Sequence, residues 1–237
     1  MEQSISENDV INKLKDKLVG SGWEDILNPF LDSSEFYKIT TTLIQNHQNN
    51  IRFTPRYFDI LNAFIECPYD KTKVVILGQD PYPQVGVADG IAFSCSNKGK
   101  AEKSLQYILK QTIGDYTDTG RVMYTPEECD LRRWSNQGVL LINTAFTCQI
   151  NKIGSHFHLW QPFTNYLFKY LNENNKLIFA LMGKKAEIWE TKLSNQILLK
   201  CPHPASAAYK GGVWDSKDIF NNINLELNKL NKTKINW

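Results

Sequence analysis

The stretch KVVILGQDPY, residues 73–82, decides the fold of this chain. It begins with a short apolar run rich in β-branched residues and turns polar at Gly78. Such a run, with no polar residue alternating in it, is typical of a parallel strand buried on both faces. Three similar runs follow at residues 139–142, 177–181 and 196–199. The pattern predicts four buried strands.

Segments with helical spacing separate these strands, near residues 104–112, 161–172 and 185–192. Strands that alternate with helices favour an α/β fold with a parallel sheet. Ligands of such sheets bind beyond the carboxyl ends of the strands. The residues that follow each strand are therefore the first place to look for a site.

Upstream of the first strand, helices are predicted over residues 10–27 and 35–45, and a third helix is predicted to open at Pro55. No repeat, low-complexity tract or Gly/Ser/Pro linker interrupts the chain. We expect a single domain over residues 1–237, with residues 1–22 as a helical or partly flexible lead-in.

Composition excludes several classes of protein. Of the 237 residues, 42% are hydrophobic, which supports a large core and argues against a disordered or fibrous chain. The net charge is +2, so any contact with DNA depends on a local patch rather than on bulk charge. No apolar run approaches the ~20 residues that span a bilayer. The polar N-terminus lacks the layout of a secretory signal. We expect an intracellular protein without membrane contact, cytoplasmic in a prokaryote or virus and nuclear in a eukaryote.

The five cysteines lie far apart and form no CxxC motif. This spacing predicts free thiols and matches neither zinc nor iron–sulfur ligation. No metal or other cofactor is expected.

Three chemically useful side chains follow the predicted strands. Asp80 follows the first strand, Asn143 the second and His203 the fourth. An acid, an amide and an imidazole in one cleft can orient a water, read a hydrogen-bonding edge and stabilise developing negative charge. Each also has a structural alternative: Asp80 caps a turn, Asn143 satisfies loop backbone groups, and His203 packs in a loop.

The same stretch, residues 73–82, resembles the signature of the family-1 uracil-DNA glycosylases. Further blocks resemble that family in the same order: GIAFS at 90–94, WSNQGVLLINT at 134–144, SH at 155–156, CPHP at 201–204 and INW at 235–237. The resemblance extends from about Trp23 to Trp237. It implies a short central parallel sheet flanked by helices on both faces.

The resemblance also implies a reaction, the hydrolysis of the bond between uracil and deoxyribose in DNA, on a nucleotide flipped out of the duplex. Asp80 would orient the attacking water and stabilise positive charge on the sugar. His203 would donate a hydrogen bond to uracil O2 as the base leaves as an anion. The backbone of Gln79 would contact the same oxygen.

Base selection would come from three further side chains. Asn143 would donate to uracil O4 and accept from N3–H, a pattern that cytosine reverses. Phe93 would stack on the base, and Tyr82 would occupy the place of a thymine methyl group. Ordinary core packing is the alternative for both aromatic residues. Ser104 would contact a DNA phosphate, with helix capping as its alternative.

The chain departs from the family pattern at three places. Pro83 and Asp89 stand where histidine is frequent. The family usually continues the histidine loop as HPSPLS, whereas residues 203–211 here read HPASAAYKG. The leucine that enters the duplex behind the flipped base is therefore missing, and alanine is too small to replace it.

Tyr209 is our candidate for that duplex-entering residue, and weaker handling of duplex DNA is the alternative. Ser206 is the candidate replacement for a phosphate-contacting serine of the family loop. Lys210 and Lys217 are candidates for a local positive patch, with ordinary solvated lysines as the alternative.

The implied partners are uracil-containing single- and double-stranded DNA, and DNA-mimicking protein inhibitors are possible further partners of a monomer. A non-catalytic DNA-binding or replication-accessory protein on the same fold is the rival interpretation. A repurposed binder has no need for the complete set of predicted pocket residues, namely Gln79, Asp80, Tyr82, Phe93, Asn143 and His203. A glycosylase for thymine mismatches is a second rival, against which Tyr82 argues.

Overall fold

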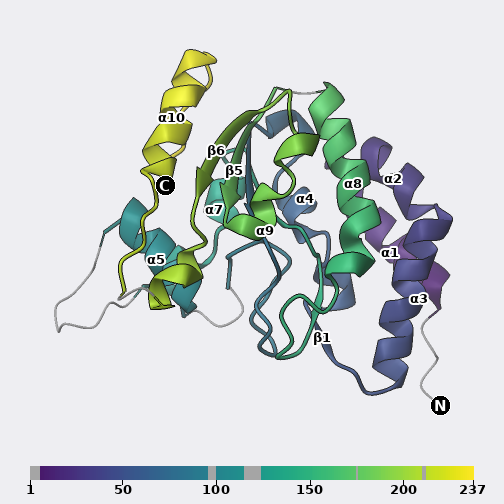
Figure 1. Cartoon of the computed structure of the whole chain (residues 1–237). Helices are drawn as coiled ribbons and strands as arrows, with labels where there is room; N and C mark the ends of the chain where they lie inside the picture. The colour runs from purple at the N-terminus through teal and green to yellow at the C-terminus, as the bar shows by residue number, and fades with distance from the viewer. Residues whose placement is uncertain (1–5, 96–99, 115–123, 175, 210–211) are drawn as a thin grey trace.

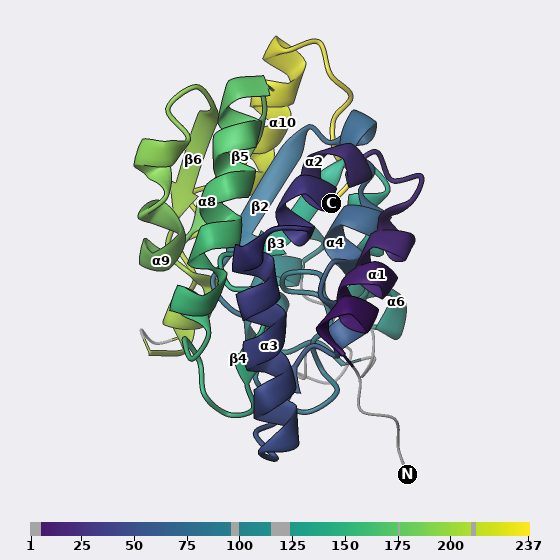
Figure 2. The ribbon, with the colours of Figure 1, turned by 90° about the vertical axis from the view of Figure 1, so that its right-hand side faces the viewer.

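Four short parallel strands form the centre of the molecule: β2 (Val74–Gly78), β3 (Val139–Asn143), β5 (Ile178–Met182) and β6 (Ile197–Cys201). They lie in the order β3-β2-β5-β6; Figure 1 labels β5 and β6, and Figure 2 labels all four. The computed structural model describes residues 6–95, 100–114, 124–174, 176–209 and 212–237, with only the backbone at 208 and 209. Each predicted strand is confirmed, and each begins and ends within two residues of its predicted bounds.

The register brings the carboxyl ends of the strands to one edge of the sheet. Gly78 at the end of β2 pairs with Asn143 at the end of β3. Met182 at the end of β5 pairs with Cys201 at the end of β6. The segments that follow these strands therefore start side by side.

The central strands are buried on both faces, so alternate residues enter two separate cores. Val75 and Leu77 point into one core, and Val74 and Ile76 point into the other. Because neither face meets solvent, neither carries polar residues, which explains the unbroken apolar run in the sequence. The predicted α/β fold with helices on both faces is confirmed.

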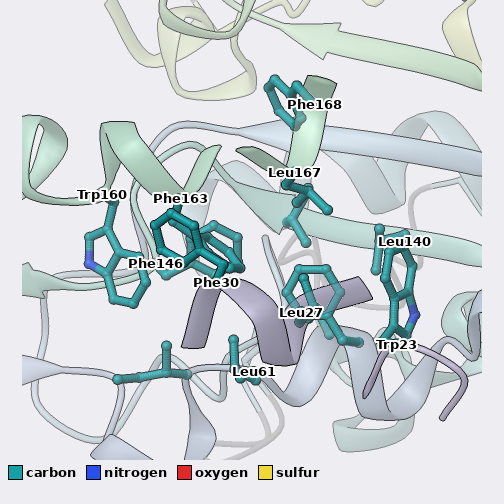
Figure 3. Close-up of a cluster of buried hydrophobic side chains, with 14 of the residues drawn as sticks. Trp23, Leu27, Phe30, Leu61, Leu140, Phe146, Trp160, Phe163, Leu167 and Phe168 are labelled. Atoms are coloured by element: carbon teal, nitrogen blue, oxygen red, sulfur yellow. The ribbon is translucent and has the colours of Figure 1, made fainter. Parts of the chain in front are cut away.

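The first core lies under the N-terminal helices and the longest helix. These are α1 (Glu7–Leu18), α2 (Glu24–Leu31), α3 (Ser34–Gln48), α4 (Asn62–Glu66) and α8 (Phe157–Asn174). They cover one face of the sheet in both views (Figures 1 and 2). Trp160 and Phe163 of α8 pack against Phe146 and Phe30, with ring centroids 4.9 to 5.8 Å apart within this group (Figure 3).

The second core lies under α5 (Lys103–Thr112), α6 (Pro126–Cys129), α7 (Arg132–Ser135) and α10 (Ile219–Lys229). Trp237 near the chain end packs against Phe220 of α10 and Trp134 of α7, with centroids 5.0 and 5.1 Å apart. These contacts fix the C-terminal segment to the sheet.

Three predicted helices are interrupted in the structure. The helix expected over residues 10–27 is two helices, because Gly20 and Gly22 adopt φ values of +83° and +75°, which no helix accommodates. The helix expected from Pro55 is a 3₁₀ turn, η1 (Tyr57–Asp59), followed by α4. The helix expected over residues 185–192 is α9 (Lys184–Glu187) followed by η3 (Glu190–Lys192).

The remaining elements are short. They are β1 (Phe53–Thr54), β4 (Cys148–Gln149), η2 (Tyr69–Lys71) and η4 (Pro204–Tyr209). β1 and β4 pair in an antiparallel manner and hold the segment after β3 against the N-terminal half of the chain. In the described part of the chain, no helix is long and apolar enough to cross a membrane. All five cysteines are buried as free thiols.

Candidate active site

A cavity of about 220 Å³ opens at the carboxyl ends of β2, β3 and β6. All six residues predicted to form a base pocket line it, and so does Ser104. They come from the loop after β2, the segment ending at Phe93, the end of β3, the loop after β6 and the first turn of α5. The site thus draws on chain segments from residue 79 to residue 203.

The two oxygens of the Asp80 carboxyl group have different surroundings. Its Oδ2 accepts a 2.7 Å hydrogen bond from the side-chain amide of Gln79. Its Oδ1 is buried and accepts no well-formed hydrogen bond from the described residues. Burial raises the pKa of Asp80, although the Gln79 amide, the Gly154 backbone N–H and Lys185 oppose this. Oδ1 is therefore the oxygen of this carboxyl group that retains hydrogen-bonding capacity for a ligand.

His203 is neutral at physiological pH. Burial lowers the pKa of its imidazole to about 4. Its Nδ1 accepts a 3.1 Å hydrogen bond from the backbone N–H of Ala205, which assigns the remaining proton to Nε2. Nε2–H is therefore the one hydrogen-bond donor of this ring.

Asn143 is the last residue of β3 and is 9% exposed. Within the described residues, its amide forms no hydrogen bond with another protein group, so both its donor and its acceptor remain available to a ligand. The turn beside it is held by its neighbour Thr144, whose N–H and Oγ1 donate to the backbone oxygens of Gly78 and Gln79.

Phe93 and Tyr82 form the aromatic part of the pocket. The Tyr82 hydroxyl donates a 3.1 Å hydrogen bond to the backbone oxygen of Phe93. The Phe93 ring lies 5.7 Å from the His203 ring, centroid to centroid. Phe93 has a backbone φ of +66°, an uncommon value for a bulky residue. Its position is therefore imposed by its surroundings.

The predicted DNA contacts have different outcomes. Ser104 lies in the first turn of α5, where Glu102 is the N-cap residue, so Ser104 does not cap the helix. Ser206 lies in η4 and is not part of the cavity wall. Lys210 and the side chain of Tyr209 lie outside the described residues. Lys217 is exposed and pairs with Asp215, which favours the reading of an ordinary surface lysine.

Sequence reasoning missed two features of the pocket. Ile153 lines the cavity although its side chain is 66% exposed, so it stands at the pocket mouth. Ser94 also lines the cavity and donates to a buried carboxylate, that of Asp89. Of these residues, only Asp89 stands out in the sequence, as a departure from the family pattern.

No cluster of three or more histidine, cysteine, aspartate or glutamate side chains suited to a metal ion exists in the part of the chain that the structure describes. The polar side chains of the cavity wall are instead one carboxylate, one neutral imidazole, two amides and the hydroxyls of Tyr82, Ser94 and Ser104.

The comparison with known families agrees with this arrangement. A family model described as the Uracil DNA glycosylase superfamily matches residues 64–228. The chain belongs to this superfamily. The matched residues include every member of the cavity wall except Ile60.

The relatives of this superfamily member include proteins from bacteria and a virus. A uracil-DNA glycosylase of Fusobacterium nucleatum is 36% identical over 223 residues, which cover 92% of this chain and 96% of that protein. Mimivirus uracil-DNA glycosylase superposes with a TM-score of 0.80 at 27% identity, covering 94% of this chain and 88% of that one. A variant of mimivirus UNG, solved in complex with UGI, superposes with a TM-score of 0.79 at 27% identity, covering 94% and 90%.

Proposed function

We propose that this chain is a monofunctional uracil-DNA glycosylase that hydrolyses the N-glycosidic bond of deoxyuridine in DNA and so begins base excision repair. The single observation that carries this proposal is the cavity in which Asp80, Asn143 and a neutral His203 meet. Membership of the superfamily supports it, and nothing favours a non-catalytic accessory role.

Asp80 acts on the water and on the sugar. Its Oδ1 accepts a hydrogen bond from the attacking water and orients the water toward C1′ of the flipped nucleotide. As the glycosidic bond lengthens, the sugar gains oxocarbenium character, which the carboxylate stabilises. For this role Asp80 must be ionised.

His203 acts on the departing base. Its Nε2–H donates to uracil O2, where negative charge develops as the bond breaks. A neutral imidazole is sufficient, because uracil leaves as an anion that needs a hydrogen bond rather than full protonation. The backbone of Gln79 contacts the same oxygen.

Three side chains select uracil. The Asn143 amide donates to O4 and accepts from N3–H, so cytosine leaves two buried polar groups unpaired. Phe93 stacks on the ring. Tyr82 fills the space that the C5 methyl group of thymine requires.

The deciding experiment measures release of free uracil from a uracil-containing oligonucleotide. We expect turnover by the wild type and no detectable turnover by Asp80→Asn/His203→Gln, which keeps the shape of the pocket. Absence of release at stoichiometric enzyme would refute the enzymatic proposal. Release of thymine from G·T pairs at a comparable rate would refute the assigned specificity.

We also propose that the loop after His203 contacts DNA. Ser104 and Ser206 contact phosphates, Lys210 adds positive charge, and Tyr209 enters the duplex in place of the family leucine. Tyr209→Ala is then expected to slow excision from duplex DNA about tenfold or more and to leave single-stranded substrate almost unaffected, since only the duplex must be opened. Equal rates on duplex DNA for wild type and variant would exclude Tyr209.

The assignments of domain organisation, oligomeric state, location and DNA substrates rest on the same proposal. The chain acts as a single domain and as a monomer inside the cell, on both single- and double-stranded DNA. Since the related mimivirus protein was solved in complex with UGI, we propose that a DNA-mimicking inhibitor of that kind binds the same face here. Protection from UGI by uracil-containing DNA would support this, and inhibition that DNA does not relieve would oppose it.

A further inference from the structure

Asp89 is a buried carboxylate that the proposed reaction does not use. It is 2% exposed and lies four residues before Phe93. A charged side chain is buried at a cost unless it is paired and hydrogen-bonded, so its presence calls for a role. The resemblance to the family offers none, because histidine is frequent at this position there.

Both oxygens of Asp89 hold the turn that carries Phe93. Oδ1 accepts a 3.1 Å hydrogen bond from the backbone N–H of Ile91. Oδ2 accepts a 2.7 Å hydrogen bond from the hydroxyl of Ser94. The carboxylate therefore spans the turn and binds one residue on each side of Phe93, Ile91 and Ser94.

This turn, from Asp89 to Ser94, is also bonded to the rest of the protein. The Ser94 hydroxyl accepts from the backbone N–H of Leu131, and Ala92 N–H donates to the oxygen of Leu141 in β3. Arg132 Nη1 lies 3.5 Å from Asp89 Oδ2. Arg132 is itself held by Glu66 at 2.8 Å and by Asp130 at 3.1 Å.

This network accounts for the unusual backbone of Phe93. A φ of +66° at a bulky residue is strained and persists only where the surroundings impose it. Here the carboxylate binds Ile91, two residues before Phe93, and Ser94, directly after it, and Tyr82 binds the backbone oxygen of Phe93 itself. Without the carboxylate, the turn loses two of the bonds that hold the ring in the pocket wall.

We infer that Asp89, acting through Ser94 and paired with Arg132, is a positioning residue that sets the Phe93 ring against the base. The inference rests on the proposed function, because Phe93 is taken to stack on uracil. Asp89 does not touch the base. It determines how much of the stacking surface of Phe93 the base meets, and therefore how tightly uracil is held.

The test is a double-mutant cycle between Asp89→Asn and Phe93→Ala. Asp89→Asn keeps the volume of the side chain, and Arg132 retains Glu66 and Asp130, so the fold is expected to persist. In the wild-type background we expect kcat/KM and the affinity for free uracil each to fall about tenfold, about the size of one hydrogen bond to a charged group. In the Phe93→Ala background we expect a further loss of less than about twofold.

Asp130→Asn is the matched control, because Asp130 contacts the same Arg132 nitrogen but not the turn. We expect it to leave kcat/KM unchanged. Ser94→Ala is the second variant. It removes both hydrogen bonds of the Ser94 hydroxyl, the one to Asp89 and the one from Leu131, without leaving a new charge, and we expect it to reproduce a smaller part of the Asp89→Asn loss.

Hydrogen exchange provides a readout independent of activity. We expect the Ile91 and Ala92 amides to exchange faster in Asp89→Asn, with the amides of β2 and β3 unchanged. Equal losses in both backgrounds of the cycle, or an equal loss in Asp130→Asn, would overturn the inference. If the wild type released no uracil, the proposed function would fail, while exchange at Ile91 would still show whether Asp89 orders the turn.

Discussion

Oδ1 of Asn143 lies 2.4 Å from the place that a Cβ atom on Gly78 would occupy. The two residues are partners in the register of β2 and β3. The Phe93 ring approaches the same place to 3.3 Å. A side chain at position 78 would collide with Asn143 and Phe93, so only glycine fits there. The absence of a side chain on Gly78 leaves room for the pocket at the end of the strand.

Gly78→Ala tests this relationship. The added methyl group must displace the Asn143 amide and the Phe93 ring, so we expect kcat/KM for uracil release to fall about a hundredfold or more. The cost of overpacking is about 1–3 kcal/mol, so the protein is expected to remain folded at 25 °C. Val75→Ala, in the same strand but facing the first core, is the control that loses stability without losing activity. Retention of activity by Gly78→Ala would show that the pocket adapts.

Asp80→Asn is expected to abolish catalysis and to stabilise the fold. Burial raises the pKa of Asp80, so the folded protein favours the protonated form, and the ionised form present at pH 7 costs stability. This cost is absent below the unfolded-state pKa and appears as pH rises through the folded-state pKa. Asparagine removes the charge and still accepts from Gln79. Thermal unfolding at pH 7 should show a raised midpoint, and a lowered midpoint would contradict this account.

Asn143→Asp is expected to lower the preference for uracil over cytosine. An aspartate accepts from the cytosine amino group and cannot donate to uracil O4, so the ratio of the two kcat/KM values should fall at least about a hundredfold. The measurement is base release from oligonucleotides that differ only at the target base. Asn143→Ala is the matched control, which should lower uracil release without raising cytosine release. An unchanged ratio in Asn143→Asp would remove Asn143 from base reading.

Acid is expected to destabilise the fold through two buried histidines. Burial lowers the pKa of His203 and of His156 to about 4 from an ordinary value of 6.5. Between about pH 6.5 and pH 4 the unfolded chain therefore binds protons that the folded protein does not bind. The free energy of unfolding should fall by up to about 2 kcal/mol per histidine between pH 7 and pH 5.

Urea unfolding at the two pH values measures this difference. His203→Gln should remove roughly half of it, since one of the two groups is gone. A wild-type protein that is equally stable at pH 5 and pH 7 would show that these imidazoles are not held neutral by the fold.

His156 illustrates how the loop after β3 is held. Its Nδ1 lies 2.8 Å from Thr147 Oγ1, to which Trp160 Nε1 also donates at 2.7 Å, and its Nε2 lies 3.3 Å from Asn46 Nδ2. This buried network joins α3 and α8 to the segment that leaves Asn143. Protonation of His156 would thus act on the site as well as on stability.

The strands could be predicted from the sequence because burial on both faces leaves an unbroken apolar run. Their ends were harder to place, since Gly78 and Asn143 are polar or small yet remain in the ladder. The helix over residues 35–45 was predicted almost correctly because its apolar positions recur at helical spacing and Ser33 caps it. The break at Gly20 to Gly22 was missed, because the apolar spacing continues across it while the backbone does not.

The convergence of Asp80, Asn143 and His203 followed from strand topology alone. What topology does not supply is the support behind the pocket. Asp89 lies between an alanine and a glycine in a loop, where a carboxylate is usually solvated, and its partner Arg132 is about forty residues away along the chain. No local pattern signals such a long-range contact. Ile153 was missed for the opposite reason, since an isolated apolar residue in a loop resembles ordinary surface.

The five buried cysteines make the folded molecule a poor target for thiol reagents. Burial raises the pKa of each thiol, to about 12 for Cys95, Cys148 and Cys201. The reactive species is the thiolate, so we expect alkylation only after local or global unfolding exposes the thiol. The Cys148 thiol donates to Pro81 of the pocket wall, Cys95 lies in the second core and Cys67 lies in the first core. The order in which an alkylating reagent labels these native side chains would therefore record which part of the enzyme opens first, without any introduced probe.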